Sequence, residues 1–229
     1  TAGFSIVTYT GNDGSWGSGN QDTFGHGLSA APEFIIVKER NATDAWTVFH
    51  HSVGAGGGTT AAHNNLRLDT NEVLYTNQSY KSFGGVMPTS TVVTVEGNTT
   101  NLSTSNHVAY CWHSVEGYSK FGQYEGNANA DGAFIYTGFR PRILIIRVLN
   151  VASDGWLIYD TERETFNPLD TILKLHDHAA DYSNAAYRCD ILSNGFKLRS
   201  SDNAVNGTSY DPYVYMVWGD VPFKYNNSF

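Results

Sequence analysis

The sequence predicts an all-β fold, an antiparallel β-sandwich or jelly roll, and three observations lead to this prediction. Short runs rich in Val, Ile, Tyr and Phe recur along the chain, bounded by Gly, Asn, Asp and Ser. The 229 residues include 23 glycines and are 14% aromatic, a composition typical of strands joined by tight turns. No window has the hydrophobic period of an amphipathic helix.

The apolar runs predict strands along the whole chain. Val, Ile and aromatic side chains favour the pleated, half-buried surface of a sheet, and each run has the length of a strand. In chain order, the expected strands are Ser5–Tyr9, Phe34–Glu39, Trp46–His50, Val92–Glu96, Val108–His113, Lys120–Glu125, Ile143–Leu149, Trp156–Asp160, Phe196–Arg199 and Tyr213–Trp218. The glycine-rich connections between them suit a sandwich.

Two of these runs, Phe34–Val37 and Ile143–Ile146, are apolar at every position. A strand with one wet face would alternate between apolar and polar residues, and these do not. We therefore expect both to be covered on two faces, at a junction between two parts of the molecule or against a partner chain.

The chain also contains an internal repeat, because the segment from Val7 to Tyr118 is loosely restated from Gly122 to Phe223. For example, Asp44-Ala45-Trp46 reappears as Asp154-Gly155-Trp156. Positions that recur in both copies are expected to hold the fold, whereas positions found in one copy are candidates for function.

The repeat predicts two tandem, pseudo-symmetric β-sandwich units, at residues 1–118 and 119–229. The seam between them, Ser114–Ser119, is too short to act as a flexible linker. We therefore expect the units to pack tightly, as two small sandwiches or as two halves of one domain.

Composition and charge exclude some classes of partner. The net charge of −8 and the absence of a basic cluster argue against nucleic acid. No apolar stretch approaches the ~20 residues that a spanning helix needs, so we expect no membrane insertion. A chain that begins at Thr1 is expected to be processed or part of a longer protein. The weakly charged, polar composition is typical of extracellular proteins.

The two cysteines, Cys111 and Cys189, have no metal-binding spacing. We expect them to be buried free thiols; a disulfide between them is the alternative.

Several segments together resemble a known family: HVAYCWHSVEGYSKFGQYEGN, ADGAFIYTGFRPRILIIR, DGWLIYDTERETFNP and ILSNGFKLR. They are similar to an uncharacterised repeated domain of marine tailed bacteriophages, including cyanophages, found in tail-fibre and other virion adhesion proteins near concanavalin-like sandwich modules. The resemblance covers essentially the whole chain and implies an oligomeric, extracellular virion protein with a host-facing role. It supplies no catalytic residue.

Loops present in one copy supply the candidate ligand site. They are Gly11–Gly19, Gly54–Leu66, Asn77–Gly85 and Lys174–Tyr187. Aromatic rings suit stacking on a sugar, while amide, guanidinium and carboxylate groups suit its hydroxyls. The residues expected to bind a glycan are Trp16, Asn64, Asn65, Arg67, Asp69, Tyr75 and Tyr80. The repeated tryptophans, Trp46, Trp112, Trp156 and Trp218, are expected to pack in the core instead.

Other polar clusters have competing interpretations. Asn127, Asn129 and Asp131 have the alternating oxygen ligands of a calcium loop, but the pattern also fits an Asx-rich turn and lacks the late Glu of an EF-hand. On a strand, His176 and His178 would point to one side and could meet a metal on a three-fold axis; surface histidines are the alternative.

We expect no enzymatic activity. Acidic pairs such as Glu162 with Glu164 and Asp177 with Asp181 lie in turns, and no catalytic sequence motif is present. The sequence thus favours a tail-fibre or receptor-binding domain without a cofactor, which recognises host cell-surface polysaccharide or lipopolysaccharide. We expect it to contact other virion proteins and to form a homo-oligomer, with a trimer favoured. The rival is a structural virion component, a capsid decoration or fibre shaft, without a ligand.

Overall fold

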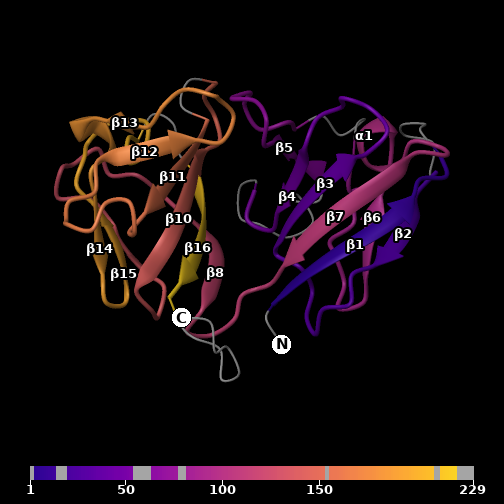
Figure 1. Ribbon diagram of the computed structural model, residues 1–229, viewed down its shortest axis with the longest axis horizontal. Coiled ribbons are helices and arrows are strands. Elements are labelled where there is room, and N and C mark those ends of the chain that lie inside the picture. Colours follow the sequence, from indigo (N-terminus) through magenta and orange to yellow (C-terminus); the bar gives the residue numbers. More distant parts are fainter. Residues whose placement is uncertain are drawn as a thin grey trace.

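The computed structural model describes residues 3–13, 20–53, 63–76, 81–152, 155–208 and 212–220. Antiparallel sheets make up most of it, and Figure 1 shows them as two halves side by side, with the end of the chain on the left and its beginning on the right. Helical structure within these residues comprises α1 (Asn98–Asn101), the short 3₁₀ helix η2 (Ala185–Tyr187) and a 3₁₀ conformation at His63. The predicted all-β sandwich class is confirmed.

The N-terminal half consists of a five-stranded and a two-stranded sheet. The larger has the order β1-β7-β3-β4-β5, and its strands are β1 (Phe4–Thr10), β7 (Asn106–Trp112), β3 (Phe34–Glu39), β4 (Thr47–His50) and β5 (Leu66–Arg67). The smaller pairs β2 (Asp22–Gly25) with β6 (Val92–Val95). Apolar side chains between the two sheets form the first core, which includes Phe24, Ile35, Val37, Phe49, Val93 and Cys111.

The C-terminal half consists of a six-stranded and a three-stranded sheet. The larger has the order β13-β12-β11-β10-β16-β8, with β13 (Tyr182–Ser183), β12 (Thr171–Lys174), β11 (Trp156–Asp160), β10 (Pro141–Val148), β16 (Tyr213–Gly219) and β8 (Ser119–Tyr124). The smaller has the order β14-β15-β9, with β14 (Cys189–Leu192), β15 (Gly195–Leu198) and β9 (Phe134–Tyr136). The second core between them includes Ile135, Leu144, Ile146, Tyr159, Phe196 and Tyr215.

The strands of the two halves have the same spatial order in their sheets. Starting from the edge at β1, the order β1-β7-β3-β4-β5 corresponds to β8-β16-β10-β11-β12. The pair β2-β6 likewise corresponds to β9-β15. This correspondence is what an internal repeat requires, and the division at residue 118 stays a prediction.

A third apolar cluster, the junction core, joins the halves. It combines residues of the five-stranded sheet with residues of the six-stranded sheet, including Phe34, Ile36, Val48, Phe121, Trp156, Val214 and Met216. In β3, Phe34 and Ile36 face this junction while Ile35 and Val37 face the first core. Both faces of the apolar run in β3 are therefore covered, as the sequence predicted. Residues of the same chain cover them, in the first core and in the junction core.

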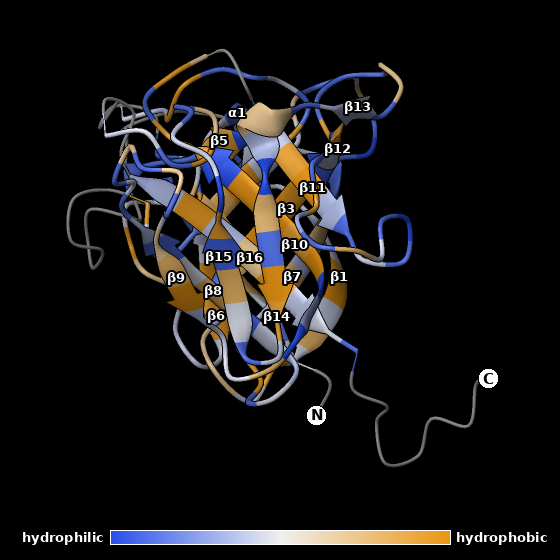
Figure 2. Cartoon of the chain, turned by 90° about the vertical axis from the view of Figure 1, so that its left-hand side faces the viewer, coloured by the Kyte–Doolittle hydropathy of each residue, from blue (hydrophilic) through white to orange (hydrophobic). Residues whose placement is uncertain are grey.

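Hydrophobic residues gather in the strands, and the connections at their ends are mostly hydrophilic (Figure 2). Cys111 and Cys189 are buried free thiols, as predicted. Burial raises the pKa of the Cys111 thiol to about 12, so this group stays protonated at neutral pH. In the described part of the chain, no helix is long and apolar enough to cross a membrane.

Candidate functional site

The predicted ligand residues fall partly outside the described structure. Trp16 and Tyr80 belong to segments that the structure does not describe. Arg67 lies on β5, two residues after Asn65 and two residues before Asp69.

Asn64 and Asn65 are buried, whereas a glycan site would expose their amides. The Asn64 side chain donates to the carbonyl of Val53 at 3.5 Å. Asn65 and Tyr75 exchange two backbone hydrogen bonds, of 3.1 and 2.9 Å. Both asparagines therefore anchor the segment around β5, and their predicted contact with a ligand stays a prediction.

Arg67 and Tyr75 do meet at the surface. The guanidinium carbon of Arg67 lies 5.5 Å from the centre of the Tyr75 ring, which is exposed. Arg67 also pairs with the Glu72 carboxylate at 3.4 Å. This part of the surface therefore offers the exposed Tyr75 ring beside the Arg67 guanidinium, whose charge is partly balanced by Glu72.

Asp69 lies beside a shallow hollow of about 240 Å³, lined by Trp46, Leu68, Asp69 and Leu175. Its carboxylate accepts the backbone N–H of Trp46 at 3.2 Å. Trp46 is half-buried against the junction core, whereas its counterpart Trp156 is fully buried. Core packing is thus confirmed for Trp156, whose indole donates to the carbonyl of Arg67 at 2.7 Å.

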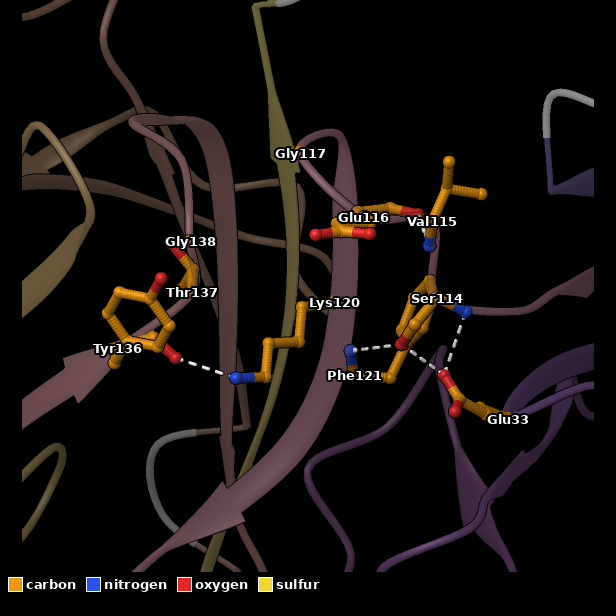
Figure 3. A pocket seen from close by; sticks show the side chains of 11 residues that line it. Glu33, Ser114, Val115, Glu116, Gly117, Lys120, Phe121, Tyr136, Thr137 and Gly138 are labelled. Carbon is orange, nitrogen blue, oxygen red and sulfur yellow. Dashed lines mark hydrogen bonds between the residues drawn. The ribbon is translucent and has the colours of Figure 1, made fainter.

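A larger hollow, of about 560 Å³, opens where the chain passes from one half to the other. We call it the seam hollow. It is lined by Glu33, Ser114, Val115, Glu116, Gly117, Ser119, Lys120, Phe121, Tyr136, Thr137 and Gly138 (Figure 3). The connection between β7 and β8, the start of β8 and the end of β9 supply most of these residues.

One wall of the seam hollow is held by Glu33. Its Oε2 accepts the backbone N–H of Ser114 at 2.8 Å and also accepts the Ser114 hydroxyl. The Ser114 oxygen in turn accepts the N–H of Phe121 at 3.3 Å. These bonds fix the turn at Ser114 to the start of β8, and Figure 3 shows them on the side of the hollow away from Tyr136.

The opposite wall carries Tyr136, whose side chain is 59% exposed. Lys120 extends across the hollow, and its Nζ donates to the carbonyl of Tyr136 at 2.7 Å (Figure 3). The same ammonium lies 5.5 Å from the centre of the Tyr136 ring. A flat aromatic surface and a positioned cation thus share one concave site.

Sequence reasoning missed this site. The run Phe134-Ile135-Tyr136 does alternate, with Ile135 buried and its two neighbours exposed. That short alternation was the available signal for an exposed ring. Nothing in the sequence places Glu33 beside Ser114, which lies 81 residues away.

The loop of Asn127, Asn129 and Asp131 is bonded as an Asx-rich turn. Asn127 Oδ1 accepts the N–H of Asn129 at 3.1 Å, and Asn129 Oδ1 accepts the N–H of Asp131 at 2.9 Å. The Asp131 carboxylate pairs with Lys197 at 3.1 Å, and this hydrogen bond lowers its pKa. The oxygens proposed as calcium ligands are engaged with protein groups, which favours the turn interpretation.

The carboxylates considered for hydrolysis are each bonded to a different group of the protein. Glu162 pairs with Arg142 at 2.8 Å, whereas Glu164 accepts the backbone N–H of Asp170 at 3.0 Å. Asp181 pairs with Arg163 at 2.6 Å.

His176 and His178 follow β12, which ends at Lys174, so they do not lie on a strand and the condition for the metal interpretation is not met. His176 Nδ1 instead accepts the N–H of Trp156 at 3.3 Å. Among the described residues, no group of three or more His, Cys, Asp or Glu side chains is placed to hold a metal ion.

Comparison with known proteins gives one match. A family model described as "Domain of unknown function (DUF7483)" matches residues 1–222. Neither the curated proteins nor the solved structures contain a match.

Proposed function

The chain belongs to the family described as domain of unknown function DUF7483, so we propose its function from its own site. We propose that it is a non-enzymatic carbohydrate-binding domain of a virion surface protein, which recognises a host cell-surface polysaccharide or lipopolysaccharide. The observation that carries the proposal is the seam hollow, where the exposed ring of Tyr136 lies beside fixed hydrogen-bonding groups.

The shape of the seam hollow fits a short saccharide. Its volume of about 560 Å³ lies in the range of small-molecule sites, ~300–1,000 Å³. A sugar ring has an apolar C–H face that can lie on an aromatic ring, and Tyr136 offers such a ring on a strand of the three-stranded sheet. Because β9 is hydrogen-bonded to β15, the ring is held in place before a ligand arrives.

The polar groups of the seam hollow fit hydroxyls. Lys120 is a donor held at a defined place, while Glu33 and Glu116 bring carboxylate acceptors to the lining. With two carboxylates, one ammonium and a net chain charge of −8, the hollow favours neutral or amino sugars over uronic acids and phosphates.

The location on a virion rests on the sequence resemblance to phage adhesion domains. Single sugar sites of this kind bind weakly, and display of many copies on one particle would raise the overall affinity. A purely structural role in the virion is the second candidate, favoured by the exposed apolar residues Phe4 and Ile6 on β1.

An array of bacterial surface polysaccharides and lipopolysaccharides, probed with the labelled full chain, tests the proposal. We expect saturable binding to a subset of glycans, reduced at least tenfold by Tyr136→Ala. The matched control is Phe166→Ala, which removes an aromatic ring that is 84% exposed outside the hollow. Absence of binding by the folded wild-type chain, or equal binding by the Tyr136→Ala variant, would overturn it.

A further inference from the structure

We propose that the outer edge of β1 is a dimer interface, at which β1 pairs antiparallel with β1 of a second copy of this chain. Among the described residues, β1 is hydrogen-bonded to β7 alone and forms the end of the five-stranded sheet. This inference concerns assembly and does not depend on the proposed glycan site.

The register identifies which backbone groups face the free edge. Gly3 accepts the N–H of His113, and Gly11 donates to Ser105, so odd-numbered positions here point toward β7. Because successive residues of a strand point their N–H and C=O groups in opposite directions, even-numbered positions face outward. These are Phe4, Ile6, Thr8 and Thr10.

The outer edge of β1 lacks the usual protection against pairing. Exposed edges are normally blunted by charged residues, proline or bulges. The seven residues of β1, FSIVTYT, include no charge and no proline, and their pairing with β7 is continuous. Phe4 and Ile6 are 40% and 59% exposed.

The corresponding edge strand of the other half is protected. β8 is paired with β16 on one side, and Phe121, the β8 counterpart of Ile6, has its outward backbone groups bonded within the chain. Its N–H donates to the Ser114 hydroxyl oxygen at 3.3 Å, and its carbonyl accepts from His51 Nε2 at 3.1 Å. The molecule thus covers one of two equivalent edges and leaves the other open.

A second copy fits this edge better than another partner does. The exposed side of β1 continues the junction interface, since the Phe4 ring stacks on Trp112 at 4.8 Å and Trp112 packs on the junction core. A two-fold axis perpendicular to the sheet would keep Phe4 and Ile6 of both copies on one face, where they would bury each other. β1 itself carries no charge, so the pairing would place no like charges opposite each other within the strand.

The pairing gives a two-fold dimer in place of the trimer expected from the sequence. It also makes a residue-by-residue prediction about amide hydrogen exchange. In the dimer, the amides of Ile6 and Thr8 are protected by the second copy, whereas those of Ser5, Val7 and Tyr9 are protected by β7 in any state.

The experiment combines sedimentation equilibrium with amide hydrogen exchange on the full chain. We expect a mass twice the 25.1 kDa of one chain and slow exchange at Ile6 and Thr8. Ile6→Lys should halve the mass and speed exchange at Thr8 at least tenfold, while Val7 and Tyr9 stay slow and report that β1 is still folded. Phe166→Lys, the matched charge control, should remain dimeric.

Three results would overturn the inference. They are a wild-type mass of one chain, a dimer with fast exchange at Ile6 and Thr8, and an oligomer that Ile6→Lys leaves intact. A chain ending at Asp220 should also be dimeric; if only this shortened chain dimerised, residues 221–229 and not a second copy would be the native occupant of the edge.

Discussion

Asn101 and Asn206 show at the level of single residues how the two halves match. Asn101 Oδ1 accepts the backbone N–H of Asn12 at 3.2 Å, and Asn206 Oδ1 accepts that of Asn127 at 3.1 Å. Each asparagine side chain also donates back to the same partner, at 3.1 and 2.8 Å. Both are completely buried, so these bonds replace solvation that the groups lose on folding.

Asn206→Ala should therefore lower the free energy of unfolding. Its Nδ2 also donates to the carbonyls of Asn129 and Ser200, each at 2.8 Å, and the substitution leaves these acceptors without their donor. We expect a loss of about 2–3 kcal/mol, measured by urea denaturation. Asn129→Ala, at an exposed position with one side-chain acceptor bond, should cost less than about 1 kcal/mol. Similar losses in the two variants would contradict this account.

His50 is a buried histidine whose protonation state the fold determines. Its Nδ1 accepts the N–H of Ser52 at 3.1 Å, so Nε2 carries the proton and donates to the carbonyl of Tyr215 at 3.3 Å. Burial, and to a smaller extent the nearby His51, lowers the pKa of His50 from 6.5 to about 3.

This shift predicts loss of stability in mild acid. The unfolded chain binds a proton at His50 below pH 6.5 and the folded chain does not, so stability is full above pH 6.5 and falls as the pH drops toward 3. Between pH 7 and 5 the contribution is about 2 kcal/mol. Urea denaturation at both pH values should show this loss in the wild type and a smaller one in His50→Gln. An equal loss in both proteins would assign the acid sensitivity to other groups.

The residues predicted to bind a ligand show the limits of reasoning from side-chain type. Asn64 and Asn65 were expected to bind a glycan because they lie in a loop found in one copy and their amides suit sugar hydroxyls. They are buried because hydrogen bonds to Val53 and Tyr75 hold the segment against the fold. Such bonds join residues in separate segments of the chain and leave no local pattern in the sequence.

At the level of elements, every strand expected from the sequence is present, with ends shifted by a residue or two. Runs buried on both faces, such as Phe34–Glu39, gave the clearest signal because hydrophobicity alone marks them. The strands that were missed, β2, β5, β9, β12, β13 and β14, have two to four residues. Such short strands are defined by the neighbour with which they pair and not by their own composition.

Strand β3 should be sensitive to truncation of its side chains, because both of its faces are packed. Ile35 is fully buried in the first core, and Ile35→Ala should lower the free energy of unfolding by about 2–4 kcal/mol. Val86→Ala, at an exposed position in a connection, is the control and should cost less than about 0.5 kcal/mol. Urea denaturation measures both, and a small effect at Ile35 would show that this core can readjust.

At the level of the whole molecule, the junction core ties the two halves into one folding unit. Trp156 of the C-terminal half donates to the carbonyl of Arg67 in the N-terminal half, and Phe34 stacks on Phe121 at 5.8 Å. An isolated half would expose these apolar groups to water.

Calorimetry of the full chain should therefore give a single unfolding transition. The fragment 1–118 should lack the sharp transition of the full chain, because its half of the junction core would be exposed. Two separate transitions in the full chain, or an independently stable fragment, would show that the halves are autonomous domains.

The seam hollow forms only when segments from both halves of the molecule come together, so the sequence could not reveal it. The covered runs and the repeat were sufficient to predict a tight junction. The hollow itself requires the side chains of Glu33, Lys120 and Tyr136 to meet in three dimensions, and three different parts of the chain supply them.

A titration of the full chain with oligosaccharide from a bound glycan, followed residue by residue through amide chemical shifts, tests the central claim most directly. Recognition in the seam hollow predicts the largest shifts at Ser114, Lys120, Tyr136 and Thr137, which line it. Shifts centred on Arg67 and Tyr75, or no shifts at saturating saccharide, would contradict the assignment of this hollow as the carbohydrate site.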